Sequence, residues 1–375
     1  MEKQIKENLE NPEQLEAFYR ADKRGFEKAF ERIYPQIQDL PIAVFWRIRL
    51  ENEKATGSRS SAIPKNEIWF LILSCIFAGF LIKIPQILGL ETNEYFFYGK
   101  NAGLTVFWGL SMYIFLIRKT LEIKNLVVAT LVFILSAFYI NLLPNNAESD
   151  SIKLAFIHLP LMLWCLYGLI YIDFDTTNKL RRIDYIKYNG DLAILVAIIL
   201  IAGGILTILT FGLFTAINIK IDEFYFNYIV VWGLVAAPIV GTFIIRNYPS
   251  VANKIALVIA SIFSPLVLLT LVVYLVFVGV IGKDPFQDRD FLLVFNLLLL
   301  GVMAIIVFSV SETSNDSRQR FNEWILLILS VVTLFVDLLA LSAILYRLGE
   351  YGFTPNRVAV LGSNLLIFGN LLLIT

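Results

Sequence analysis

The long apolar stretches of this sequence contain few residues that can do chemistry, and one of them is a carboxylate. Asp337 lies near the middle of the apolar run 324–346. An ionised carboxylate in hydrocarbon costs about 2.5–3.5 kcal/mol on insertion scales, so it must face the protein interior, carry a proton or have a partner. Asp337 is therefore the first candidate for a residue that binds a proton or a small solute.

Four more polar side chains lie inside other apolar runs, namely Lys83, His158, Asn296 and Asn364. At 1.5 Å per helical residue, all five lie roughly 8–13 Å from one predicted face of the membrane. We predict that they can line one polar cavity, in which Lys83 neutralises Asp337 and His158 exchanges protons near neutral pH. The alternative is a set of separate hydrogen bonds between helices, with Lys83 extending to the membrane interface.

Two carboxylates on a polar segment suggest a second chemistry. Asp173 and Asp175 begin the segment 173–191, which continues with several basic residues. Carboxylates two residues apart can hold a divalent cation that carries a phosphorylated substrate, so this pair is a weak metal candidate. A solvated loop near anionic lipid headgroups explains the same pattern.

The segment 347–357 supplies the remaining charged candidates, Arg347, Glu350 and Arg357. Gly352 and Pro355 indicate an ordered turn, and Thr354 or Asn356 can cap the helix that follows. We expect the three charged residues to form a salt-bridged lid over the polar cavity.

The elements that position these residues are predicted to be membrane-spanning helices. The chain has 375 residues, of which 58% are hydrophobic and 17% charged, against about 45–50% and about 25% in soluble domains. A helix needs about 20 apolar residues to cross a bilayer. This excludes a soluble enzyme, a nucleic-acid-binding protein and a secreted disulfide scaffold, and predicts an all-α polytopic protein. Ten runs qualify: 68–90, 101–117, 125–143, 152–172, 192–217, 229–245, 255–281, 291–311, 324–346 and 358–375.

The basic residues predict the orientation. With both termini in the cytoplasm, the cytoplasmic segments carry 23 Lys and Arg residues and the opposite loops carry 6. An excess of Lys and Arg on the cytoplasmic side is the strongest sequence rule for topology. We therefore predict that both termini are cytoplasmic.

The polar segment 1–66 precedes the bundle 67–375 and is expected to form a small amphipathic hairpin with a linker. Asn11 and Pro12 predict one helix start, and Pro41 marks a second. Tyr34-Pro35 is expected to end the first helix, whose apolar face has Asp22 as its one polar member. The hairpin can bind a protein partner, or simply stabilise the fold and set its topology.

No motif for a cofactor is present, and Cys75 and Cys165 have no neighbouring ligands at metal spacing. We expect no cofactor and no nucleic-acid partner, because the acidic and basic residues balance at 31 each. The expected partners are the lipid bilayer, a small solute or proton, and a protein at the hairpin.

The segment Tyr351-Gly352-Phe353-Thr354-Pro355-Asn356-Arg357 resembles the C-terminal signature of a bacterial inner-membrane family catalogued as domain of unknown function 4153. The Asn11-Pro12 start with Leu15-Glu16 and Tyr19-Arg20, followed by Trp46 and Arg49-Leu50, is similar to its Bacteroidota members. The resemblance implies a multi-pass protein of the bacterial inner (cytoplasmic) membrane and brings no substrate, cofactor or catalytic residue.

Three functions follow from these patterns. The first is a transporter or permease-like protein with its polar site in the outer half of the bundle. The second is a non-catalytic scaffold or sensor that binds a partner through the N-terminal hairpin. The third is a membrane-embedded transferase that uses Asp173 and Asp175.

Overall fold

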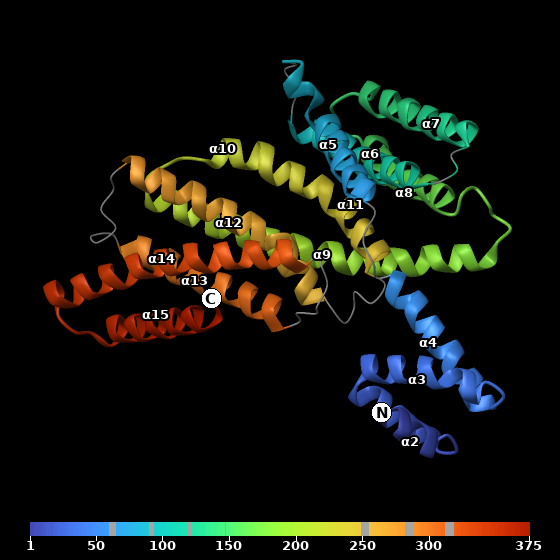
Figure 1. Ribbon diagram of the computed structural model, residues 1–375. Helices are drawn as coiled ribbons and strands as arrows, with labels where there is room; N and C mark the ends of the chain where they lie inside the picture. The colour runs from blue at the N-terminus through green and yellow to red at the C-terminus, as the bar shows by residue number, and fades with distance from the viewer. Residues whose placement is uncertain are drawn as a thin grey trace. The chain divides into compact units, whose positions relative to one another are not determined.

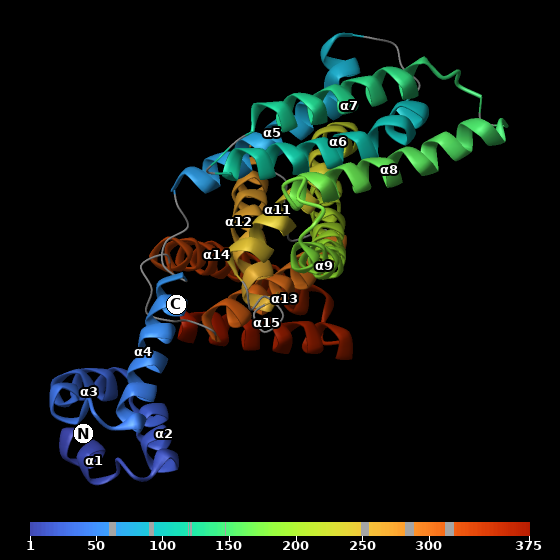
Figure 2. The same ribbon diagram turned by 90° about the vertical axis from the view of Figure 1, so that its right-hand side faces the viewer.

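The computed structural model describes residues 1–59, 65–89, 94–118, 120, 122–146, 148–248, 255–281, 289–311 and 319–375, and every regular element among them is a helix. The chain forms two compact units, Met1–Pro64 and Lys65–Thr375. Figures 1 and 2 show the helices of each unit.

The first unit contains four helices where the sequence predicts a two-helix hairpin. They are α1 (Glu2–Glu7), α2 (Pro12–Ala21), α3 (Lys23–Ile37) and α4 (Pro41–Arg59).

The predicted starts at Asn11 and Pro41 are confirmed, and the Asn11 side chain accepts the backbone N–H of Gln14. Asp22, expected inside one continuous helix, instead separates α2 from α3, because its carboxylate caps the backbone N–H of Gly25 at 2.9 Å. The predicted end at Pro35 is also wrong, since α3 runs on to Ile37. Aromatic side chains fill the core of this unit, with Trp46 in ring contact with Tyr19 and Phe26.

The second unit confirms the predicted all-α membrane fold. Nine of its described helices are long and apolar enough to cross a membrane, and a tenth, α13, is apolar over Phe295–Val307. Its elements are α5 (Lys65–Ile87), α6 (Glu94–Ile117), α7 (Ile123–Leu142), α8 (Asp150–Tyr171), α9 (Lys179–Ala216), α10 (Asp222–Phe224), the π-helix η1 (Tyr225–Val230), α11 (Val231–Asn247), α12 (Ile255–Ile281), α13 (Arg289–Ser311), α14 (Gln319–Tyr351) and α15 (Pro355–Ile374).

Helix α9 is much longer than the apolar run that predicts it. It has 38 residues and begins at Lys179, because the Asn178 side chain caps the backbone N–H groups of Leu180 and Arg181. The polar stretch 179–191, expected as a loop, is therefore the first third of a helix. Gly203 and Gly204 do not interrupt it.

Two large apolar clusters divide the interior of the second unit. One joins α5, α6, α7, α8 and α11 to the first half of α9, and includes Ala78, Tyr113 and Ile239. The other joins the second half of α9 to α12, α13, α14 and α15. Large apolar side chains such as Leu142 and Leu373 remain at least 80% exposed on the outside of the unit. Such surfaces suit contact with the lipid bilayer.

A glycine permits the close approach of α5 to α11. A Cβ atom at Gly79 would lie 2.7 Å from the ring of Trp232. Small residues at helix contacts are a common packing device in membranes.

Candidate functional site

Asp337 lies on α14 and is shielded from the exterior of the unit. Its side chain is fully buried, and neither carboxylate oxygen has a hydrogen-bond partner among the described residues. It lies fourteen residues from the end of α14, or about 21 Å along the axis. A buried polar atom without a partner is the exception in folded proteins, so this carboxylate calls for an explanation in terms of an ion, water or proton.

Two amides on helices that pack against α14 share this property. Asn364 of α15 is fully buried with both polar atoms unpartnered, and the Oδ1 atom of Asn296 in α13 is buried without a partner. Asn296 and Asn364 lie about 10 and 14 Å from the beginnings of α13 and α15, and Asp337 lies about 21 Å from the end of α14. Measured from the ends of their helices, the three residues span a range of about 11 Å, because α14 continues to Tyr351.

Lys83 lies in the other apolar cluster, with two tyrosines. Its side chain is 1% exposed, and its Nζ atom donates to the Tyr98 hydroxyl at 2.9 Å. The same atom lies 5.5 Å and 5.4 Å from the ring centroids of Tyr98 and Tyr228. These cation–π contacts stabilise the buried ammonium, and the described residues show no carboxylate paired with it. The predicted pairing of Lys83 with Asp337 is wrong.

His158 is exposed on α8, and its Nδ1 atom lies 2.8 Å from the backbone oxygen of Leu154. It borders a shallow hollow of about 430 Å³ between α7 and α8, which Leu135, Tyr139 and Met162 also line. His158 is therefore exposed on α8, and of the five candidates only Asp337, Asn296 and Asn364 lie on helices that pack together, namely α14, α13 and α15.

The two acidic candidates of the segment 173–191 hold arginines. Asp173 forms an ion pair with Arg118 at 2.9 Å, and its φ of 63° places it in the left-handed region. Asp175 accepts the Thr177 hydroxyl at 2.6 Å, which lowers the pKa of its carboxyl, and lies 3.9 Å from Arg181. The described residues contain no group of three acidic, His or Cys side chains that could hold a metal.

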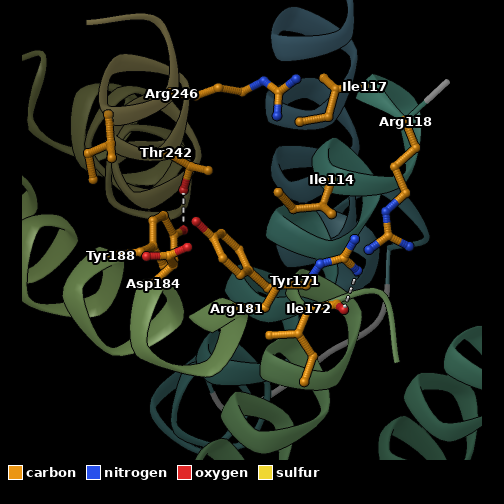
Figure 3. A pocket seen from close by; sticks show the side chains of 11 residues that line it. Ile114, Ile117, Arg118, Tyr171, Ile172, Arg181, Asp184, Tyr188, Thr242 and Arg246 are labelled. Carbon is orange, nitrogen blue, oxygen red and sulfur yellow. Dashed lines mark hydrogen bonds between the residues drawn. The ribbon is translucent and has the colours of Figure 1, made fainter. Parts of the chain in front are cut away.

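Beside this turn is a pocket of about 550 Å³, which we call the arginine pocket (Figure 3). It is formed by the ends of α6, α8 and α11 and the first turns of α9. Its lining residues are Ile114, Ile117, Arg118, Tyr171, Ile172, Arg181, Asp184, Tyr188, Thr242, Ile245 and Arg246.

Each arginine of the pocket is fixed along part of its guanidinium group. Arg118 donates to the backbone oxygen of Ile170 in addition to its pairing with Asp173. Burial lowers the pKa of Arg118, and the charge of Asp173 acts in the opposite direction. Arg181 donates to the backbone oxygen of Ile172 at 3.2 Å.

The third arginine is held by an acidic residue of another helix. The Nε atom of Arg246 donates to Glu67 of α5 at 3.0 Å. Sequence analysis missed the pocket, although all three arginines stand where apolar segments meet the side predicted to be cytoplasmic.

A chain of hydroxyls supports the pocket wall. The Thr242 hydroxyl donates to the backbone oxygen of Pro238 at 2.8 Å, and Tyr188 lies 2.6 Å from Thr242 and 2.7 Å from Tyr167. Because a hydroxyl has one proton, Tyr188 must donate to Thr242 and Tyr167 must donate to Tyr188. This order joins α8, α9 and α11 and fixes the pocket wall.

The predicted lid does not form. Arg347 and Glu350 lie inside α14, and the described residues show no ion pair among these two and Arg357. Arg357 instead donates to the backbone oxygens of Tyr351 and Gly352 at 2.8 and 2.7 Å. It thereby satisfies carbonyls at the end of α14. The Thr354 side chain caps α15, as the sequence predicts.

None of the protein-family models, curated proteins or solved structures compared with this chain matches it. The resemblance of the segment 351–357 to the bacterial inner-membrane family therefore stays a prediction.

Proposed function

We propose that the chain is a proton-coupled, transporter-like protein of the bacterial inner membrane, with Asp337 as the proton-binding residue. One observation carries the proposal, which is that Asp337 is fully buried with both oxygens unpartnered in the described part of the chain. Ionisable groups inside membrane helices are costly and commonly mark ion and proton pathways. A proton removes the cost of the buried charge, and its release restores an acceptor for a solute.

The unpartnered amides support a route to this carboxylate. Asn296 and Asn364 lie about 10 and 14 Å from the beginnings of α13 and α15, which both pack against α14, and each has a buried polar atom without a partner among the described residues. Under the orientation that the basic residues predict, this route begins at the outer face of the membrane. The transported solute would then enter from outside, and the polar site would belong to the outer half of the bundle.

Proton flux into proteoliposomes tests the proposal. Full-length protein is reconstituted with a trapped pH-sensitive dye, and a potassium diffusion potential drives the flux. We expect wild type to acidify the lumen. The rate of acidification with Asp337→Asn should be at least tenfold lower. Asp191→Asn, which changes an exposed carboxylate of α9, is the matched control and should keep the rate.

The stability of the variant separates loss of function from loss of fold. Asp337→Asn puts a neutral amide in place of a carboxyl whose ionised form costs about 2.5–3.5 kcal/mol on insertion scales, so the variant should unfold at the same temperature as wild type or higher. Equal flux in wild type, Asp337→Asn and empty liposomes would contradict the proposal.

The N-terminal unit favours the scaffold or sensor as a second candidate function. A groove of about 660 Å³ lies between α2 and α4, and Phe45 on its edge is 56% exposed. In this alternative, deletion of residues 1–55 removes a protein partner from pull-downs while membrane insertion persists. Unchanged partners would argue against it.

The transferase alternative has less support, because the carboxylates of Asp173 and Asp175 already contact Arg118, Thr177 and Arg181.

A further inference from the structure

We propose that the arginine pocket binds a phosphate group, carried either by an anionic lipid or by a soluble anion. The pocket is lined by the guanidinium groups of Arg118, Arg181 and Arg246 and by a single carboxylate, Asp184 (Figure 3). The residues that hold the arginines, which include Asp173 and Glu67, do not line it. Three guanidinium groups against one carboxylate in the lining suit a phosphate ester, and Asp173, Asp175 and Glu67 offset part of the arginine charge from outside the lining.

The arginines keep hydrogen-bond donors that no described residue uses. Arg246 is bonded through Nε alone, which leaves its two terminal amino groups, and Arg181 is bonded through Nη1 alone. A guanidinium has five N–H donors in a plane and matches two oxygens of a phosphate at once. Side chains fixed at one edge lose less conformational entropy when the other edge binds a ligand.

The position of the pocket suits a ligand with an apolar part. Its wall includes Ile114, Ile117 and Ile245, and it lies at the ends of α6 and α11, where apolar segments give way to charged residues. Basic pockets between membrane helices commonly bind lipid headgroups. A volume of about 550 Å³ lies within the roughly 300–1,000 Å³ typical of small-ligand sites.

Thermal unfolding of the full-length protein in a neutral detergent tests the proposal with defined probes. One arm adds phosphatidylglycerol and compares it with diacylglycerol, which lacks the phosphate. The other arm adds sodium phosphate and compares it with sodium chloride at equal ionic strength. We expect one of the two phosphate probes to raise the midpoint saturably, and the arm that does so identifies the lipid or the soluble source.

Variants assign the effect to the pocket. Arg181→Gln combined with Arg246→Gln should weaken the apparent affinity at least tenfold. Arg182→Gln removes the same single charge as Arg181→Gln alone, from an adjacent exposed residue outside the lining, and should leave the affinity unchanged. Asp184→Asn removes the one negative charge of the lining and should tighten binding several-fold.

Three outcomes would overturn the proposal. The first is no saturable shift with either phosphate probe, and the second is an equal loss of affinity in Arg181→Gln and Arg182→Gln. The third is weaker binding in Asp184→Asn, which remains informative if the double arginine variant fails to fold.

Discussion

Glu67 connects three helices through one oxygen atom, and its removal should destabilise the membrane unit. The Oε1 atom accepts hydrogen bonds from Tyr113 of α6 and from Arg246 and Asn247 of α11, each at 3.0 Å. Glu67 itself is 8% exposed and lies in the first turn of α5. One carboxylate therefore links the ends of α5, α6 and α11.

The expected cost of Glu67→Ala follows from the burial of each donor. A hydrogen bond to a charged group contributes about 1.5–3 kcal/mol. Tyr113 is fully buried, so its bond should count near the middle of that range. The Arg246 side chain is 51% exposed, so water can replace most of its hydrogen bond to Glu67. The net contribution of this bond to stability should therefore be below about 1 kcal/mol. With Asn247 partly buried, we expect a loss of about 3–4 kcal/mol in the free energy of unfolding.

The assay is equilibrium unfolding of the purified full-length protein in mixed micelles. Glu67→Gln keeps an acceptor oxygen and should cost about 1–2 kcal/mol. Asp150→Ala, which removes an exposed carboxylate paired with Lys153 at 3.3 Å, is the control and should change stability by less than about 0.5 kcal/mol.

A double-mutant cycle tests whether Glu67 acts through the tyrosine. Glu67→Ala and Tyr113→Phe should be less than additive, with a coupling of about 1–2 kcal/mol. A loss below about 1 kcal/mol for Glu67→Ala, or strict additivity with Tyr113→Phe, would refute the reasoning.

Two more predictions concern packing and pH. Gly79→Ala should destabilise the protein by about 1–2 kcal/mol, because the new methyl group would lie 2.7 Å from Trp232 and overpacking outweighs the gain in helix propensity. Gly204→Ala, whose Cβ would meet nothing within 4 Å, should be neutral or stabilising by up to about 1 kcal/mol in the same unfolding assay. The pKa of Glu16 lies below its ordinary 4.5 because two arginines donate hydrogen bonds to it. Its stabilising contribution is therefore complete above pH 4.5 and is lost as the pH falls through its folded-state value. Hydrogen exchange of the full-length protein should show more protection of α2 in wild type than in Glu16→Gln at pH 6, and this difference should shrink as the pH is lowered below 4.5.

The helices of the membrane unit could be predicted because the bilayer sets a length requirement. An apolar run of about 20 residues has few alternatives to a helix in hydrocarbon. The ends of the helices were harder to predict, as α9 shows. Its first turns are polar, which is typical of a loop, but the Asn178 cap starts a helix there. Asp22 shows the same effect in reverse, since a carboxylate at a helical position ended one helix and began another.

The candidate site could be predicted only in part, because depth along a helix does not specify lateral contact. Lys83 and Asp337 have similar predicted depths, yet they belong to different apolar clusters. The arginine pocket needs residues from four helices, and no short sequence pattern predicts that α6 and α8 pack with α9 and α11. The sequence does place Arg118, Arg181 and Arg246 on the same predicted side of the membrane. That placement does not distinguish a pocket from a basic surface.

The length of α9 has a mechanical consequence. At 1.5 Å per residue its 38 residues span about 57 Å, nearly twice the roughly 30 Å hydrocarbon thickness of a bilayer. Arg181, near its beginning, lines the arginine pocket, and Leu213, near its end, packs in the cluster that also contains the α14 residues beside Asp337. If α9 tilts as a rigid body about its first turns at the pocket, its other end moves. A tilt of about 5° displaces that end by about 5 Å over this length, comparable to the rise of one helical turn.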